Sequence, residues 1–254
     1  MKGLRPALIL SAFLLITLPL MAVQQVFLWF WPAMARRFPM HYHRMLARLL
    51  GIRINAKGHP PPEGPTLIVS NHLGWLDIVV LSAVTPLSFV AKREVAGWPL
   101  FGSLARLQRT VFVDRERRHA TGAGRDDMQE RLKAGDTLVL FPEGTSSDGF
   151  RMLPFKSSFF GAAALPGVTV QPMTLAIQGH RGNPIPRHLM PFYAWYGDMN
   201  LAPHLWEALN RGPIEATVEF HQPLSLSGET SRKALAAHAE QLVREGLVRV
   251  MRGR

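Results

Sequence analysis

Apolar runs of strand length alternate with stretches of helical spacing over most of the chain. The strand-like runs are 66–70, 87–91, 110–114, 137–141 and 168–177. The helix candidates between them are 75–83, 99–107, 125–134 and 155–165. This alternation predicts an α/β fold with a mainly parallel central sheet flanked by helices.

The pattern continues toward the C-terminus without an internal repeat or a second domain boundary. Two further strand candidates, 192–195 and 215–220, enclose a short helix near 203–209. A final stretch, 231–251, is amphipathic, and we expect its apolar face to pack on the core. That face carries Leu235, Leu242, Val243, Leu247 and Val250.

The N-terminal stretch 7–35 contains no charged residue. Because about 20 apolar residues span the hydrocarbon layer of a bilayer, this stretch is long enough to enter a membrane. Pro19 and the pair Gln24-Gln25 interrupt it, and the aromatic cluster 29–31 suits the membrane interface. Basic residues flank both ends, so one crossing and a hairpin with both ends in the cytoplasm remain open.

A second short helix is expected over 41–50, lying on the membrane. The polar segment 57–64, with three consecutive prolines, reads as the connection into the rest of the chain. We therefore divide the chain into an N-terminal membrane-anchoring helical segment, residues 1–50, and one catalytic domain, residues 51–254.

A cleaved signal peptide is the alternative interpretation of the N-terminus. The start is basic, and Ala33-Met34-Ala35 has the small-x-small pattern of a cleavage site. The uncharged stretch is longer than the apolar core of a normal signal peptide, and bulky aromatic residues stand just before the site. Membrane anchoring is the interpretation that we prefer.

Composition narrows the classes of function. The 254 residues include no cysteine, which excludes disulfides, thiolate metal ligands and a cysteine nucleophile. The formal net charge of +11 fits nucleic acid, anionic lipid or an acidic substrate as partner. The sequence has no zinc finger, basic tail or aromatic RNA-binding signature, so we expect no nucleic-acid partner.

Candidate chemistry begins directly after the run 66–70. His72 and Asp77 stand five apart, in a turn that Asn71 and Gly74 favour between a strand and a helix. A histidine at the carboxyl end of a strand, held in one tautomer by a carboxylate, can take a proton from a hydroxyl group. The spacing alone has a simpler interpretation, a capping histidine beside a solvated aspartate.

Two other strand ends carry polar residues. Glu143, Gly144 and Thr145 follow the run 137–141, where the carboxylate and the backbone amides could position a substrate. Arg115 follows the run 110–114 and could bind a phosphate in a bidentate manner. Each is also typical of a plain surface turn. Because the carboxyl ends of parallel strands meet at one edge, we expect these residues to converge with His72.

These segments together resemble the 1-acylglycerol-3-phosphate acyltransferases and related glycerolipid, or lysophospholipid, acyltransferases, over roughly residues 50–200. Residues 71–77 look like the family's N-H-x4-D block, and residues 141–145, Phe-Pro-Glu-Gly-Thr, look like its third block. Residues 112–115 and 170–173 look like the second and fourth blocks, and Lys156 matches a lysine that commonly follows the third. Four blocks in order are more specific than any one of them.

The resemblance implies an O-acyltransferase. His72 would be the general base for a lysolipid hydroxyl that attacks an acyl thioester, and Asp77 would orient it. Arg115, Glu143, Gly144, Thr145 and Lys156 would bind the substrate. The implied acyl donor is acyl-CoA or acyl carrier protein, with no further cofactor and no metal. The first expectation for the acceptor is 1-acylglycerol-3-phosphate, giving phosphatidic acid, at the cytoplasmic side of the inner membrane.

Two departures from the family pattern bear on the acceptor. Ser146 and Ser147 follow Thr145, where the third block usually continues with arginine, and Arg109 aligns with the glycine that usually opens the second block. Arg109, Arg115 and Lys156 could compensate for the lost arginine. The alternative acceptor is lyso-ornithine lipid, which needs no phosphate clamp. An alternative of another class is an inactive, membrane-peripheral lipid-binding protein.

Overall fold

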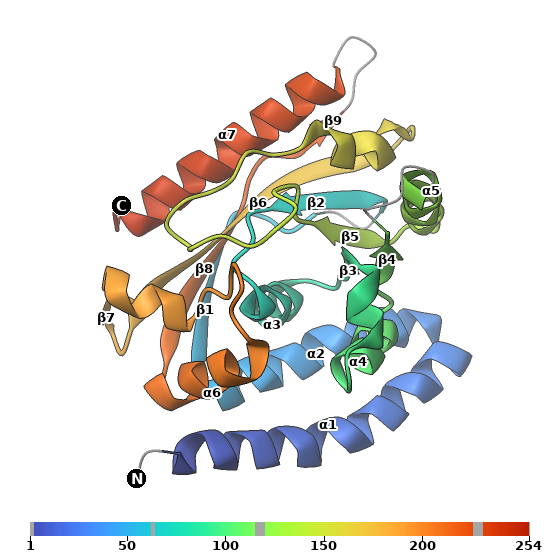
Figure 1. Cartoon of the computed structure of the whole chain (residues 1–254). Coiled ribbons are helices and arrows are strands. Elements are labelled where there is room, and N and C mark those ends of the chain that lie inside the picture. The colour runs from blue at the N-terminus through green and yellow to red at the C-terminus, as the bar shows by residue number, and fades with distance from the viewer. Residues whose placement is uncertain (1–2, 62–63, 115–119, 226–230, 254) are drawn as a thin grey trace.

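The computed structural model describes residues 3–61, 64–114, 120–225 and 231–253 (Figure 1). The helices are α1 Leu4–Phe30, α2 Pro32–Leu50, α3 Trp75–Val84, α4 Phe101–Leu107, α5 Ala120–Lys133, α6 Leu201–Arg211 and α7 Arg232–Met251. The strands are β1 Ile52–Lys57, β2 Thr66–Ser70, β3 Ser88–Lys92, β4 Val111–Val113, β5 Thr137–Leu140, β6 Thr169–His180, β7 Asn183–Pro184, β8 Ile214–Phe220 and β9 Leu224–Ser225. Three 3-10 helices occupy Arg93–Gly97, Ser157–Ala164 and Arg187–Phe192.

The strands form one mixed sheet in the order β1-β8-β6-β2-β5-β3-β4. From β6 to β4 all neighbours run parallel, whereas β8 is antiparallel to β6. The short strands β7 and β9 pair with β6 off this path. The predicted α/β fold with a mainly parallel sheet is therefore confirmed, and β2 and β5 lie side by side at its centre.

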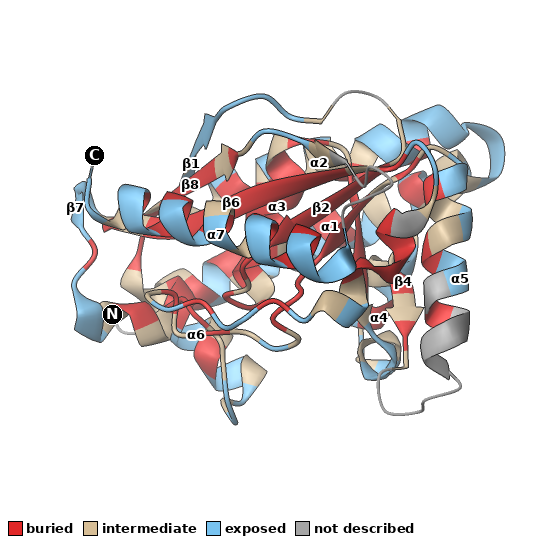
Figure 2. Cartoon of the chain, turned by 90° about the horizontal axis from the view of Figure 1, so that it is seen from above, coloured by how far each residue is buried: buried red, intermediate tan, exposed pale blue. Residues whose placement is uncertain are grey.

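Helices cover both faces of the sheet, and the central strands β2, β5 and β6 are mostly buried between them (Figure 2). One core cluster joins α2 and α3 to the sheet, and the other joins α5, α7 and the segment 157–164 to the opposite face. Helix α7 turns its predicted apolar face inward, with Leu235, Val243, Leu247 and Val250 buried and Leu242 half-buried. That prediction is confirmed.

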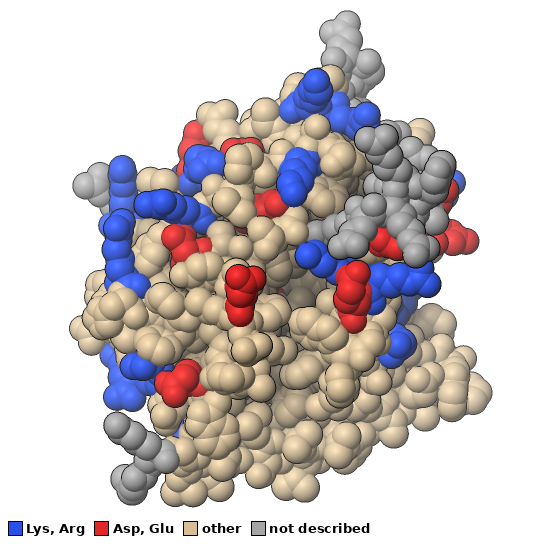
Figure 3. Space-filling view, in the orientation of Figure 1, with Lys and Arg blue, Asp and Glu red and all other residues tan. Residues whose placement is uncertain are grey.

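The first two helices form a hairpin on the outside of the domain. Helix α1 packs along α2 and reaches α6 with its first part and α4 with its last part (Figure 1). It is long and apolar enough to cross a membrane, yet only 17% of its most apolar window is buried. In the view of Figure 3, the lower part of the molecule, where α1 lies, shows almost no charged side chains. An apolar face of this kind indicates membrane association.

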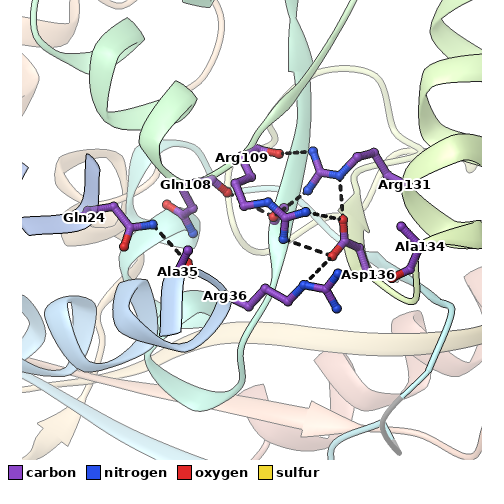
Figure 4. A network of polar contacts seen from close by, with 9 residues as sticks. Gln24, Ala35, Arg36, Gln108, Arg109, Arg131, Ala134 and Asp136 are labelled. Carbon is purple, nitrogen blue, oxygen red and sulfur yellow. Dashed lines mark hydrogen bonds and ion pairs between the residues drawn. The ribbon is translucent and has the colours of Figure 1, made fainter. Parts of the chain in front are cut away.

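Polar bonds hold α1 and α2 to the domain. Gln24 is buried and donates from Nε2 to the carbonyl oxygens of Ala35 and Leu107, both at 2.9 Å, which joins α1 to α2 and α4 (Figure 4). Nearby, Arg36 of α2 pairs with the buried Asp136 at 3.2 Å. Gln24, which interrupts the apolar stretch, thus has a structural use.

Several element predictions were wrong in detail. The second N-terminal helix begins at residue 32, not 41, and the residues of the predicted helix 155–165 form a 3-10 helix. The predicted strand 192–195 does not exist, because the amides of Tyr193 and Ala194 both donate to Met190 O in a turn. Strand β1 was missed because most of its residues are exposed, which leaves no apolar run at this edge of the sheet.

Candidate active site

The site begins where β2 and β5 end next to each other. Asn71 follows β2 and exchanges two hydrogen bonds with Leu175 of β6, in which its Nδ2 donates at 2.8 Å and its Oδ1 accepts at 2.9 Å. The side chain thus extends the hydrogen bonding between β2 and β6 by one more pair of bonds, and it fixes the start of the turn. Because that turn cannot shift, His72 projects at a defined place beyond the strand.

His72 and Asp77 form a hydrogen-bonded dyad. Nδ1 of His72 lies 2.5 Å from Oδ2 of Asp77, which also accepts from the amides of Leu73 at 2.8 Å and Gly74 at 3.2 Å. Asp77 is fully buried in the first turn of α3, whereas the His72 side chain is 24% exposed. The imidazole also stacks on Phe141, with ring centroids 4.1 Å apart. One nitrogen of the imidazole is therefore bound by the carboxylate, and the accessible side of the ring remains for a substrate.

Gly74 allows the loop to pass close to Trp195. Its φ of +130° favours glycine, and a Cβ atom at this position would lie 2.8 Å from Cβ of Trp195. The amide of Trp195 donates to Leu73 O at 2.7 Å, so the two segments are fixed to each other. This approach completes the wall of the site beside His72.

Glu143 braces the histidine loop. Its Oε1 accepts from the His72 amide at 2.8 Å, and its Oε2 accepts from the Leu153 amide at 2.7 Å. The side chain is only 2% exposed. Burial raises the pKa of Glu143 from 4.5 to about 7, although these two hydrogen bonds act in the opposite direction. Both oxygens are engaged by the backbone, so Glu143 positions His72.

The remaining predicted substrate-binding residues are only partly brought together. Gly144 has φ +81°, and a Cβ atom there would lie 2.9 Å from Nζ of Lys156, so the lysine lies against this turn. Thr145 is exposed beside it. The Gly144 amide donates to Phe141 O at 3.1 Å within its own turn and is not free for a substrate oxygen. Arg115 lies outside the described residues.

Arg109 does not take part in this site. It pairs in a bidentate manner with Asp136, at 3.0 and 2.9 Å, before β4 begins. The expectation that Arg109 could replace the lost arginine is therefore wrong, because its guanidinium is used at the amino ends of the strands. Its φ of +62° explains why glycine suits this position.

A cavity of about 500 Å³ opens beside His72, a size typical of ligand pockets. The dyad side is formed by His72, Trp75, Phe141 and residues 144–146. Most of the other walls are apolar and come from the N-terminal hairpin and from α4, with Leu10, Phe13, Leu20, Met21, Leu46, Phe101 and Leu104 among them. An elongated apolar group that reaches His72 from this side would be shielded from water.

Sequence reasoning missed the residues that build these walls. Trp75 donates from Nε1 to Nδ1 of His204 at 3.1 Å, and Nε2 of His204 bonds to Ala194 O at 3.2 Å. Burial lowers the pKa of His204, which fits a neutral ring that accepts from Trp75 and donates to the carbonyl. The pair is 129 positions apart in the sequence, so no local motif could have indicated it.

The arrangement is suited to proton abstraction next to an apolar chain. A hydroxyl group placed at Nε2 of His72 would lose its proton as it attacks, and Asp77 would stabilise the imidazolium that forms. With His72 as the base, the attacking oxygen would come from the substrate, and no serine or cysteine intermediate would be needed. The apolar cavity would hold the group that is transferred.

Comparison with known proteins agrees with this chemistry. Residues 51–176 match the model of the family described as Acyltransferase. Over 258 aligned residues the chain is 44% identical to the lyso-ornithine lipid O-acyltransferase of Brucella abortus, covering 99% of this chain and 97% of that protein. The aligned region includes the N-terminal hairpin as well as the sheet.

Two further relatives are named for a different acceptor. The 1-acyl-sn-glycerol-3-phosphate acyltransferase of Neisseria gonorrhoeae is 33% identical over 189 residues, which cover 74% of this chain and 72% of that protein. The crystal structure of the 1-acyl-sn-glycerophosphate acyltransferase of Thermotoga maritima superposes with a TM-score of 0.70, covering 98% of each chain at 21% identity. At that identity the superposition establishes the shared fold.

Proposed function

The chain belongs to the family of acyltransferases that act on lysolipids, and we propose that its acceptor is a lyso-ornithine lipid. The observation that carries this choice is the 44% identity to the Brucella abortus protein over 99% of the chain. The Neisseria gonorrhoeae protein, named for a glycerol phosphate acceptor, covers 74% at 33% identity. The alignment with the Brucella abortus protein extends over the segment that forms α1 and α2.

The cation content of the described site supports the same choice. Ser146 and Ser147 stand where the related family usually has arginine, and Arg109 is engaged by Asp136. Lys156 lies against the Gly144 turn and can pair with the carboxylate of an ornithine head group. Flexible ammonium groups such as that of Lys156 make weaker clamps for a phosphate than paired arginines do, because each binds as a point charge.

In the proposed reaction, Nε2 of His72 accepts the proton of the acceptor hydroxyl while the oxygen attacks the carbonyl carbon of an acyl thioester. Asp77 holds the ring and stabilises its positive charge, and Glu143 fixes the loop through the His72 amide. The C–O ester bond forms, the C–S bond breaks, and the thiolate leaves with the proton. We propose acyl-CoA or acyl carrier protein as the acyl donor. Because both donors occur in the cytoplasm, we propose that the reaction takes place at the cytoplasmic side of the inner membrane.

1-Acylglycerol-3-phosphate is the second candidate acceptor, favoured by the similarity to the Neisseria gonorrhoeae protein. The test supplies purified protein with lyso-ornithine lipid and, in parallel, with 1-acylglycerol-3-phosphate, which is also called lysophosphatidic acid. The same acyl thioester is used in each assay. We expect product from lyso-ornithine lipid, with a kcat/KM at least tenfold above that for lysophosphatidic acid, which is the effect of about one well-placed contact. The opposite preference would reject the proposed acceptor and leave the acyl-transfer chemistry standing.

A further inference from the structure

A second cavity, of about 660 Å³, lies at the opposite end of the strands from His72. Its walls include the residues that precede β3, β4 and β5, among them Pro86, Arg109 and Asp136. The first turns of α2 complete it, with Pro32, Ala33, Arg36, Arg37 and His41. Because the dyad lies at the carboxyl ends of the strands, this cavity is distinct from the active-site cavity, although Pro39 and Gln108 line both.

One carboxylate in this cavity is shared by three guanidinium groups. Asp136 pairs with Arg36 at 3.2 Å, with Arg109 at 2.9 Å and with Arg131 at 2.5 Å (Figure 4). Arg131 also donates to Arg109 O at 2.6 Å, which holds two of the cations close together. This cluster consists of Arg36, Arg109, Arg131 and Asp136. It therefore has two more positive charges than negative ones.

This excess is held in a place where water screens it poorly. The side chains of Arg109 and Arg131 are 22% and 23% exposed, and Asp136 is 3% exposed. One arginine is enough to neutralise the charge of Asp136. The second and third guanidinium groups repel each other and the first, because the cluster contains no further carboxylate. An anion in the adjoining cavity would offset that repulsion. Arg36 is 42% exposed and lies at the cavity wall, where such an anion could reach it.

The cavity also lies next to the apolar tip of the N-terminal hairpin. Pro32 and Ala33 line it, and the neighbouring Trp31 and Met34 are 55% and 49% exposed. Trp29 and Phe30, at the end of α1, are 66% and 67% exposed. Tryptophan at such a position prefers the head-group layer of a membrane, which is also where lipid phosphates lie. A docked hairpin would therefore bring the cavity to the level of the phosphates.

We propose that this cavity binds the phosphate-bearing head group of an anionic membrane phospholipid, through Arg36 and Arg37 and the net positive charge of the cluster around Asp136. The bound lipid is neither acceptor nor product of the acyl transfer. It fixes the hairpin tip in the membrane and thereby holds the mouth of the catalytic cavity at the bilayer. The preference for a membrane lipid over a free anion comes from the exposed aromatic residues beside the cavity.

The test measures co-sedimentation of the full chain with vesicles of phosphatidylcholine alone and of phosphatidylcholine with phosphatidylglycerol. The variants are Arg37→Gln and Arg36→Gln, and the matched control is Arg249→Gln. Arg249 lies on α7, across the sheet from the hairpin, is 46% exposed and is ion-paired with Glu219 of β8. Its substitution therefore removes the same charge at a distant place. Thermal unfolding of each variant confirms that the fold is retained.

We expect the wild type and the control to bind phosphatidylglycerol vesicles more tightly than neutral ones. Each cavity variant should lose about fivefold of that preference, the effect of one basic contact at an anionic surface. Turnover with substrate in detergent micelles should stay unchanged in all of them. Arg37 is exposed and is not a member of the cluster around Asp136. Arg37→Gln therefore still tests the inference if Arg36→Gln disturbs the packing of that cluster.

Three results would overturn the inference. The first is an equal loss of vesicle preference in the control, which reports net charge alone. The second is release from phosphatidylglycerol vesicles by inorganic phosphate at constant ionic strength, which assigns the cavity to a free anion. The third is a loss of turnover in micelles with acyl carrier protein as donor, which assigns the arginines to an acidic protein partner. The proposed acyl transfer would survive each of them.

Discussion

At the scale of single residues, backbone contacts decide what each polar group of the site can do. Asp77 accepts from two amides besides His72, and Glu143 accepts from two amides at once. Groups held in this way keep a fixed geometry before a substrate arrives, which is what efficient catalysis needs. Glu143 therefore acts through the position of the His72 loop, as a positioning residue.

The raised pKa of Glu143 predicts a pH dependence of stability. Its carboxyl group keeps its proton up to a pH of about 7 in the folded state, against 4.5 when unperturbed. Between these values the folded state binds more protons than the unfolded state, so the free energy of unfolding falls as the pH rises. In Glu143→Gln this contribution is absent, and the fall between pH 4.5 and 7 should be smaller than in the wild type.

Urea unfolding at both ends of that pH window measures the difference. Glu245→Gln removes an exposed carboxylate of α7 and serves as the control, which should keep the slope of the wild type. Any constant loss of stability from turning an amide group toward a backbone N–H cancels in the comparison. An unchanged slope in Glu143→Gln would refute the assigned pKa shift.

The proposed catalytic pair was predictable because its two residues are close in sequence, whereas the residues that support the pair were not. His72 and Asp77 lie within one turn, so their spacing is readable. The contacts of Glu143 with the His72 amide and of Gly74 with Trp195 span 71 and 121 positions, and only the folded chain brings them together. The sequence also suggested that Arg109 could help to bind the phosphate of the acceptor. That prediction was wrong for the same reason, because no local pattern indicates the pairing of Arg109 with Asp136.

At the scale of elements, the N-terminal hairpin forms part of the wall of the cavity beside His72, and its long apolar helix indicates membrane association. Seven residues of α1 line the cavity beside His72: Ile9, Leu10, Phe13, Thr17, Leu20, Met21 and Gln24. The periodic elements 66–70, 75–83 and 215–220 were predicted within one or two residues, because one dominant pattern defined each. The hairpin was recognised by its composition, but its role as a wall depends on packing against α4 and α6.

Substitutions on the two faces of α1 should therefore have different effects. Met21→Trp places a larger side chain in the wall of the cavity, and we expect a shift of donor preference toward shorter acyl chains, because volume is removed from a close-packed site. Leu15→Trp, at an outward position that is 76% exposed, should leave the preference unchanged. Competition between acyl donors of different length measures both. An unchanged profile in Met21→Trp would show that the transferred chain lies elsewhere.

At the scale of the whole molecule, charge and apolar surface are separated. The chain carries a net charge of +11, yet α1 has no charged residue after Arg5, and its part of the surface shows almost no charged side chains in the view of Figure 3. This surface suits insertion into the acyl boundary of one leaflet, while the basic residues around it meet anionic lipids. Because α1 packs along the domain over its whole length, the hairpin lies across the domain in this structure.

Charges introduced on that surface should release the protein from membranes. Leu15→Glu with Leu18→Glu places two carboxylates where the leucines are 76% and 55% exposed, and we expect at least a tenfold loss of vesicle binding, since burying charge in hydrocarbon is costly. Val248→Glu, 43% exposed on α7, is the control. Flotation with vesicles measures binding, and turnover in micelles should persist. Binding as tight as in the wild type would place the membrane contact on another surface.

The measurement that tests the central claim most directly is acyl transfer by His72→Ala. The assay uses an acyl thioester with lyso-ornithine lipid, at equal amounts of membrane-bound wild type and variant. Loss of the base predicts a fall in kcat of about 10²–10⁴-fold, with vesicle binding unchanged, because the imidazole takes the proton in the transition state. Turnover in His72→Ala equal to that of the wild type would contradict the proposed mechanism.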